Sequence, residues 1–171
     1  MSELVIRAAR PEEYAAVGAI TVDAYSSDGL LAANPEYVDE LADAARRAEQ
    51  GELLVAVDGA GKLLGSVTIT LPGSVFAEIS RAGELEFRML STSPAARGRG
   101  VGEALARAVL ARARELGAQR VVLCSLDAMK SAHRLYGRLG FVRLPERDWQ
   151  PVPGFWLRAF TIDVRERGGG S

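Results

Sequence analysis

The chain has 171 residues, of which 48% are hydrophobic and 25% are charged, and its formal net charge is −1. This length and apolar content predict one domain, over residues 1–165, with a substantial core. A net charge near zero gives no general attraction to nucleic acid or a membrane surface, and no segment reaches the roughly 18 apolar residues of a membrane span, so we expect neither partner.

The first third of the chain predicts one strand and two helices. Weak alternation of apolar residues predicts a strand over 3–8. Pro11, with two glutamates behind it, is typical of a helix start, because acidic groups favour the positive end of a helix. Apolar residues at helical spacing predict a helix over 11–25 and another from Pro35 to a stop at Gly51.

The rest of the chain predicts strands that alternate with two further helices. The segment ELLVAVDGAGKLLGSVTIT predicts a β-hairpin around Asp58-Gly59, because such turns need residues that tolerate positive φ. A strand is expected near 84–92, and the apolar run QRVVLCSL is typical of a strand buried on both faces. The order β-α-α-β-β-β-α-β-α-β-β predicts an α/β domain with a mixed sheet. The polar end, residues 166–171, is expected to be disordered.

A glycine-rich stretch, RGRGVG at residues 97–102, lies at the mouth of a predicted helix. The first N–H groups of a helix lack partners and carry partial positive charge. Glycines let an anion approach these groups, and Arg97 and Arg99 add charges that suit phosphate oxygens. The stretch therefore predicts a phosphate or pyrophosphate site, or alternatively a tight turn whose arginines are solvated. No Gly-Lys-Ser/Thr tripeptide of a P-loop occurs, and the glycine spacing fits the dinucleotide fingerprint poorly.

Three linked motifs in this region resemble those of the GCN5-related N-acetyltransferase (GNAT) family. The family signature is Gln or Arg, two residues, Gly, one residue, and Gly or Ala, and Arg97, Gly100 and Gly102 match it in register. The family also has a strand that ends in a proline upstream, where Pro94 stands, and an LYxxxGF element downstream, which is LYGRLGF here. The resemblance covers roughly residues 84–142 by motif, and the rest by element order and length.

The resemblance implies acetyl-coenzyme A as co-substrate, and a mixed, mostly antiparallel sheet flanked by helices. In this family the loop amides hold the pyrophosphate of the cofactor. In this chain these are the amides of Arg97, Gly98, Arg99, Gly100, Val101 and Gly102. The pantetheine arm pairs like an extra strand with the strand before the loop, here near Leu90 and Thr92. A bulge there makes the strand splay from its neighbour and leaves backbone groups for the pantetheine amides.

Transfer of an acetyl group from a thioester to an amine requires a base, because an alkylammonium with a pKa of about 10.4 is not a nucleophile. The resemblance makes Glu86 the candidate base, since the histone-acetylating branch uses a glutamate at this position. An exposed strand glutamate is the alternative, and Glu84 on the same face is the second candidate. Tyr136 of LYGRLGF is the candidate acid, because many relatives use this tyrosine to protonate the coenzyme A sulfur. A core aromatic residue is the alternative for Tyr136, and the two roles are compatible.

Other polar residues near these motifs receive lesser roles. His133 is expected at the surface or beside the cofactor and not as the base. Met129 stands where many relatives have an asparagine that anchors pantetheine or caps the helix, so Asp127 or Ser125 is expected to cap instead. Cys124 is expected as a buried core thiol. One cysteine and one histidine can form neither an internal disulfide nor a Cys/His metal site, so no metal is expected.

The motifs leave the acceptor open. In this family it binds between the first two helices and the region that joins the last strands, here PERDWQPVPGFW. The aromatic residues of that region suit an acceptor with apolar surface, or alternatively form a stiff turn packed on its own sheet. We expect an N-acetyltransferase that acts on a small-molecule or peptide amine by direct attack in a ternary complex. The alternative is a non-catalytic coenzyme A-binding regulatory domain.

Two expectations concern the setting of the protein. The N-terminal stretch has no long apolar run of a secretory signal, so a cytoplasmic location is expected. Dimers are common in the family, which leaves a homodimer open.

Overall fold

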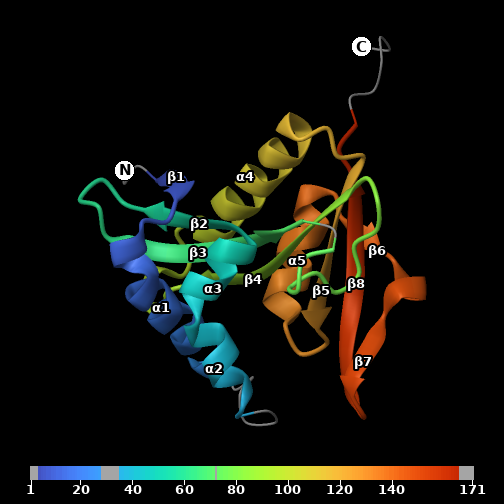
Figure 1. Ribbon diagram of the computed structural model, residues 1–171, viewed down its shortest axis with the longest axis horizontal. Helices are drawn as coiled ribbons and strands as arrows, with labels where there is room; N and C mark the ends of the chain where they lie inside the picture. The colour runs from blue at the N-terminus through green and yellow to red at the C-terminus, as the bar shows by residue number, and fades with distance from the viewer. Residues whose placement is uncertain (1–3, 28–34, 72, 166–171) are drawn as a thin grey trace.

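The computed structural model describes residues 4–27, 35–71 and 73–165, and these build one eight-stranded sheet covered by helices (Figure 1). The strands are β1 Val5–Ala8, β2 Gly51–Val57, β3 Leu63–Thr70, β4 Glu84–Thr92, β5 Arg120–Leu126, β6 Val142–Arg143, β7 Trp149–Val152 and β8 Phe155–Asp163. Their order in the sheet is β1-β2-β3-β4-β5-β8-β6, and β7 pairs with β8.

The sheet is mixed and mostly antiparallel, as predicted. Among the described strands, only β4 and β5 run parallel to each other. A parallel neighbour needs a crossover connection, and the helix that follows the glycine-rich stretch supplies it. The start of that helix therefore lies beside the end of β4, which is where the two central strands meet.

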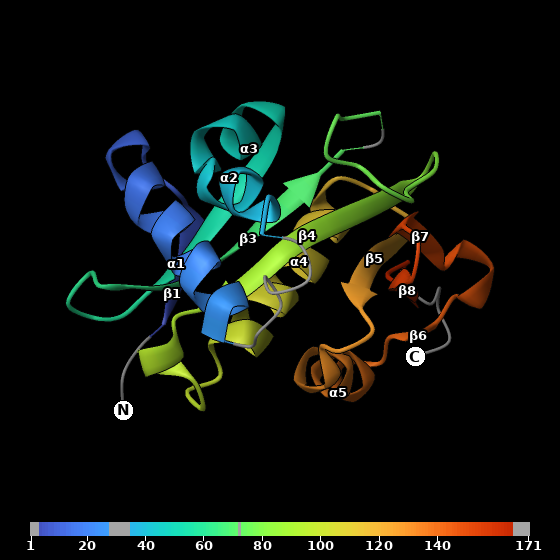
Figure 2. The same cartoon turned by 90° about the horizontal axis from the view of Figure 1, so that it is seen from below.

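Helices cover both faces of the sheet. They are α1 Tyr14–Ser27, α2 Tyr37–Ala42, α3 Ala44–Gln50, α4 Val101–Glu115 and α5 Lys130–Leu139. Figure 2 shows α1, α2 and α3 on one face and α4 and α5 on the other. The main core lies under α4, where Leu105 and Val109 are completely buried against sheet residues such as Phe87. A smaller cluster under α1 and α3 is centred on Val17 and Val55.

The structure differs from the predicted elements in two places. The helix expected from Pro35 to Gly51 is divided into α2 and α3 by Asp43, whose ψ of 67° is not helical. The Asp43 carboxylate accepts a hydrogen bond from the backbone N–H of Arg46 at 3.1 Å, so it caps the new helix. The strand β7 was not predicted, because its sequence WQPV contains a proline and shows no alternation. The expected disordered tail, residues 166–171, lies outside the described residues.

The two central strands separate soon after they begin to pair. β4 pairs with β5 only from Glu84 to Glu86. Further along, the register between β3 and β4 shifts at a bulge, and Met89 in this bulge has a φ of 57°. The expected bulge in β4 is thus present, and it falls in the pairing with β3. Beyond Glu86, the edge of β4 that faces the gap has no strand partner among the described residues.

Candidate active site

The start of α4 leaves several backbone N–H groups available to a ligand. The first hydrogen bond of this helix runs from Ala104 N–H to the Gly100 carbonyl at 3.0 Å, so the N–H groups of the first turn precede it. No described side chain caps the helix. Gly98 and Gly100 have φ values of 82° and 76°, which disfavour residues with a Cβ. The loop therefore needs glycine for its shape, and the N–H groups that follow it precede the first helical bond, as in an anion site. The amide of Arg97, which was predicted to take part, differs, because it already donates to the Pro94 carbonyl at 3.5 Å.

A groove of about 600 Å³ begins at these amides. Apart from Arg99, every residue predicted to bind the cofactor lines it: Leu90, Thr92, Arg97, Gly98, Gly100, Val101 and Gly102. From α5, Lys130 and Arg138 also line the groove, so its cationic groups come from the loop before α4 and from α5. A groove with free amides, three cationic side chains and the unpaired edge of β4 fits a long polyanionic ligand with amide groups.

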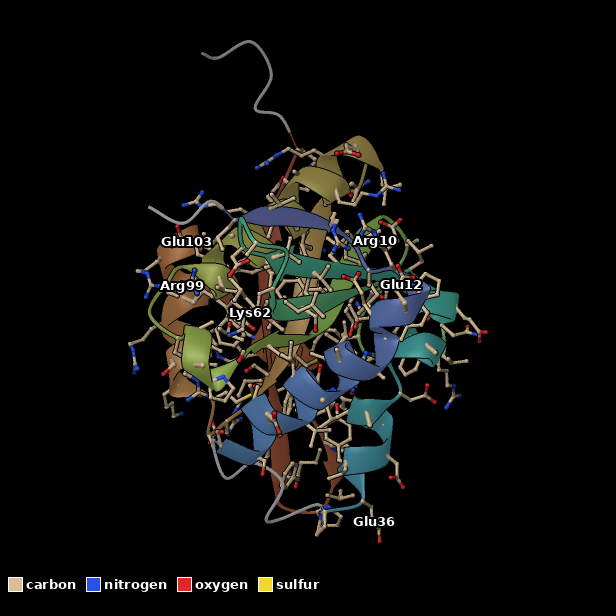
Figure 3. The ribbon with its side chains drawn as sticks, turned by 90° about the vertical axis from the view of Figure 1, so that its left-hand side faces the viewer. Arg10, Glu12, Glu36, Lys62, Arg99 and Glu103 are labelled. Carbon is tan, nitrogen blue, oxygen red and sulfur yellow. The ribbon has the colours of Figure 1, made fainter. Side chains whose placement is uncertain are left out.

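Arg99 is exposed and takes a different position. Figure 3 shows it on the same side of the molecule as Lys62, which follows the turn between β2 and β3. The carboxylate of Asp58 in that turn accepts hydrogen bonds from the backbone N–H groups of Lys62 and Ala60. These bonds, together with the positive charge of Arg99, lower the pKa of Asp58. Direct contact of Arg99 with a diphosphate stays a prediction, and its position favours an effect through charge at longer range.

A second cavity of about 460 Å³ adjoins the groove. Tyr25, Leu90 and Met129 line both spaces, so the two share a wall at the bulge of β4. Its other walls come from the loop before β4, from β4 and β5, from α2 and from the β7–β8 hairpin. A reagent held in the groove can therefore meet a second molecule at this junction.

Glu86 lies below the cavity and is completely buried. Its carboxylate accepts hydrogen bonds from consecutive backbone N–H groups of the loop before β4. The N–H of Glu78 lies 3.0 Å from each oxygen, that of Ile79 3.0 Å from Oε1, and that of Ser80 2.9 Å from Oε1. These bonds occupy both oxygens and fix the course of the loop. The geometry thus supports an anchoring role for Glu86, while its role as a base stays a prediction.

Glu78 is the carboxylate that this loop directs into the cavity. Its side chain is 16% exposed, and Oε1 lies 3.0 Å from Nε of Arg88. Burial raises the pKa of Glu78 to about 7, against the opposing charge of Arg88. A carboxyl group with this pKa exchanges a proton readily near neutral pH. Glu78 was not among the predicted site residues. The only sequence feature that could have indicated it is an acidic residue between Ala77 and Ile79 in a loop without periodicity.

Glu84, the second candidate for the base, is part of an ion-pair cluster. Its carboxylate lies 2.9 Å from Nη2 of Arg147 and 2.9 Å from Nε of Arg120, and it accepts the N–H of Arg81 at 2.8 Å. Burial opposes its ionisation, but the bonds from Arg147 and Arg81 outweigh burial and lower the pKa of Glu84. It does not line the second cavity. Its geometry is that of a structural carboxylate, which holds the start of β4 to the segment before β7.

Tyr136 lies at the base of the second cavity and is 4% exposed. Its ring packs against Phe87, Phe141 and Phe160 with centroids 5.7–6.0 Å apart. Burial, and to a smaller degree Tyr25, raise the pKa of Tyr136, so its hydroxyl keeps the proton at neutral pH. The residue is thus part of the core, as the alternative role predicted, and it also lines the cavity, while its role as the acid stays a prediction.

Three lesser predictions have mixed outcomes. Nε2 of His133 lies 3.2 Å from Ser125 Oγ and 3.1 Å from the Leu126 carbonyl, and this half-buried ring lines neither cavity. The expected cap of α5 by Asp127 or Ser125 is wrong, because no described side chain caps this helix. The expected core thiol, Cys124, is only partly buried and lines the second cavity, where burial raises its pKa to about 12.

Two further findings apply to residues 4–27, 35–71 and 73–165, which the structure describes. No group of three or more His, Cys, Asp or Glu side chains lies close enough together to hold a metal ion. Within the same residues, no helix has the length and apolar character that crossing a membrane requires.

Comparison with known proteins identifies the family. The chain matches the acetyltransferase (GNAT) family over residues 17–141, and it belongs to this family. It is 32% identical over 117 residues to an uncharacterized N-acetyltransferase of Schizosaccharomyces pombe, a match that covers 67% of this chain and 68% of that protein.

Two further proteins are similar to this chain, one by sequence and one by structure. The chain is 42% identical over 94 residues to a mycothiol acetyltransferase of Salinispora tropica, a match that covers 53% of this chain but 28% of that protein. The chain thus spans less than a third of this relative. A GNAT family acetyltransferase from Brucella melitensis in complex with acetyl-CoA has a similar structure, with a TM-score of 0.61 and 28% identity over 82% of this chain and 83% of that one.

Proposed function

We propose that this protein is an acetyl-CoA-dependent N-acetyltransferase that acts on the primary amine of a small molecule or peptide. The observation that carries the proposal is the junction of the two cavities at Leu90. On one side lie the free amides of α4, and on the other lie Glu78 and Tyr136. A non-catalytic coenzyme A-binding domain would need the groove but not this second cavity.

The groove fits acetyl-CoA by charge and by hydrogen-bonding capacity. The amides at the start of α4 would hold the diphosphate, and Arg97, Lys130 and Arg138 would add positive charge. The unpaired edge of β4 near Leu90 and Thr92 would bind the amide groups of the pantetheine arm. When bound, acetyl-CoA supplies an activated acetyl thioester at the junction of the two cavities.

Glu78 would accept the proton that the acceptor ammonium must lose. The pKa of an alkylammonium is about 10.4 in water, roughly three units above that of Glu78. The pKa of Glu78 already includes its own burial, and the cavity narrows the remaining gap because desolvation also lowers the pKa of the ammonium. Glu86 would position this base through the loop amides that it binds.

Tyr136 would donate a hydrogen bond to the departing sulfur. Its raised pKa keeps the hydroxyl protonated, so the group is a donor throughout the pH range in which Glu78 is ionised. The surrounding phenylalanine rings hold the ring in place and exclude water from the site.

The test is release of free thiol from acetyl-CoA over a panel of amines, with mass spectrometry of the acetylated product. We expect acceptor-dependent turnover, and a fall in kcat of at least about tenfold in Tyr136→Phe, which keeps the aromatic packing. Tyr14→Phe is the matched control, because Tyr14 packs in the smaller core cluster and lines neither cavity. Binding of coenzyme A without turnover of any amine would support the non-catalytic alternative. A single domain over 1–165, a cytoplasmic location and a homodimer stay predictions.

A further inference from the structure

The walls of the second cavity are mainly aromatic and aliphatic. Its aromatic rings come from Tyr25, Tyr37, Phe87, Tyr136, Trp149 and Phe155. Leu123, Leu126 and Leu157 add aliphatic surface between them. A space of about 460 Å³ with such walls buries a small apolar body and excludes a well-hydrated one.

Among the described residues that line the cavity, no cation is left available for an anionic ligand. Its lining contains two carboxylates, Glu40 and Glu78, and one guanidinium, Arg88. Arg88 is 12% exposed, and its three nitrogens are already engaged. Nε contacts Glu78 at 3.0 Å, Nη2 donates to the Tyr37 hydroxyl at 2.9 Å, and Nη1 lies 3.5 Å from Glu40 and 3.4 Å from the Phe76 carbonyl.

This charge balance selects against acceptors with a carboxylate. With Glu78 ionised, the lining has two negative charges against one positive charge. A monocationic ammonium neutralises the excess, whereas a zwitterion brings a third carboxylate into a largely apolar space. Displacing Glu78 from Arg88 to bind that carboxylate would separate a buried ion pair.

We therefore infer that the acceptor is an arylalkyl amine, a primary amine on an aromatic body with no anionic group. This inference rests on the proposed function and narrows its acceptor. The ammonium meets Glu78 and Glu40, and the ring meets the aromatic walls formed by α2, β4 and the β7–β8 hairpin.

The experiment compares four acceptors that differ in one feature each. 2-Phenylethylamine is the reference, phenylalanine adds a carboxylate, phenylalaninamide adds the same bulk without charge, and ethylamine lacks the ring. The value of kcat/KM is measured for each, and the Kd of each is measured by calorimetry on the protein saturated with coenzyme A. We expect 2-phenylethylamine and phenylalaninamide to exceed phenylalanine at least tenfold, and ethylamine to fall about 10- to 100-fold below the reference, because a buried phenyl group is lost.

The outcomes separate the two proposals. If phenylalanine matches phenylalaninamide, or ethylamine matches 2-phenylethylamine, the inference is wrong while the proposed function stands. If the arylalkyl amine binds with the expected preference but nothing is acetylated, the inference on the ligand stands and the proposed function fails. If none of the four binds or reacts, the inference is overturned, and the wider amine panel decides the proposed function.

A charge variant tests the electrostatic part by itself. Glu40 lies at the rim of the cavity with its side chain 41% exposed. We expect Glu40→Gln to lower the preference for 2-phenylethylamine over phenylalanine about two- to fivefold, as for a partly exposed charge. Glu36→Gln is the control, because Glu36 precedes the same helix, is exposed and does not line the cavity (Figure 3). An unchanged ratio in Glu40→Gln, or an equal change in both variants, contradicts the charge argument.

Discussion

Replacing Gly102 with valine tests whether the amides of α4 bind the diphosphate. Gly102 lies in the first turn of the helix and lines the groove. The GNAT signature accepts glycine or alanine at this position, so a larger side chain is the informative change. A Cβ there would lie 3.4 Å from Cδ2 of Leu135 and 3.8 Å from Oγ1 of Thr92, which are ordinary contacts. Because valine favours a helix slightly more than glycine does, we expect Gly102→Val to fold with similar stability.

The added side chain affects ligand binding more than folding. Its methyl groups stand at the amides that precede the first helical hydrogen bond, so they keep a diphosphate from approaching these amides closely. A hydrogen bond to a charged group contributes about 1.5–3 kcal/mol, so loss of one such bond raises the KM for acetyl-CoA by about 10- to 100-fold. The KM for the amine should change much less, since Gly102 does not line the second cavity.

The assay pairs steady-state kinetics with urea unfolding. Gly137→Val is the matched control, because Gly137 is an exposed helical glycine of α5 that lines neither cavity, and a Cβ added to it would have no neighbouring atom within 4 Å. We expect it to fold with similar stability and with unchanged KM values. If Gly102→Val folds normally and keeps the KM for acetyl-CoA, the amides of α4 do not bind the diphosphate, and the reasoning is refuted.

Three further substitutions test the roles of individual carboxylates. In the wild type, kcat/KM should rise as the pH passes about 7, where Glu78 loses its proton. Glu78→Gln should abolish this rise and lower kcat by about 100-fold or more. If the variant keeps the rise, the titration belongs to another group. Glu86→Gln should lower the free energy of unfolding by about 2–3 kcal/mol, because the loop amides lose a charged acceptor. If the variant instead keeps full stability and loses kcat, Glu86 is the base. The bonds from Arg143 lower the pKa of Asp148 to about 2, so its charge stabilises the fold above the ordinary carboxyl pKa, and this contribution disappears as the pH falls toward 2. We therefore expect Asp148→Asn to lower the free energy of unfolding by about 2 kcal/mol at pH 6 and by much less near pH 2, which urea unfolding at both pH values measures.

Most elements of the fold follow from local patterns, whereas the break between α2 and α3 depends on tertiary structure. The strand predicted near 84–92 and the helix after the glycines appear with these positions, because periodicity and glycine stops are local signals. The break at Asp43 was not evident, since the apolar stripe of the predicted helix continues across it. Buried Arg47 explains the break, because its guanidinium donates to the Glu40 and Leu41 carbonyls at the end of α2. Such a bond from one helix to the end of another leaves no trace in periodicity.

One part of the candidate site likewise follows from a local sequence pattern, whereas another part depends on tertiary structure. Glycines at fixed spacing dictate the shape of the α4 loop, so residues 97–102 indicated an anion site there, with a tight turn as the alternative. The proposed base, Glu78, could not be predicted, because the chemistry of a carboxylate depends on what surrounds it. Glu86 lies on the predicted strand but meets backbone amides, whereas Glu78 lies in an irregular loop and meets an apolar cavity and Arg88. Burial, and not position in a motif, raises the pKa of Glu78 toward neutrality.

The early separation of β4 from β5 explains why the groove and the second cavity meet in the middle of a sheet. If the two strands paired along their full length, β5 would occupy the backbone groups of β4 near Leu90, and no wall would be shared between groove and cavity. Pairing stops after Glu86, and from there β4 carries Arg88 to the second cavity and Leu90 to the junction. The carboxylate of Glu86 lies where the strands separate, and it binds the loop that carries Glu78. The same short pairing therefore opens the space that we propose for the thioester and positions the group that we propose as the base.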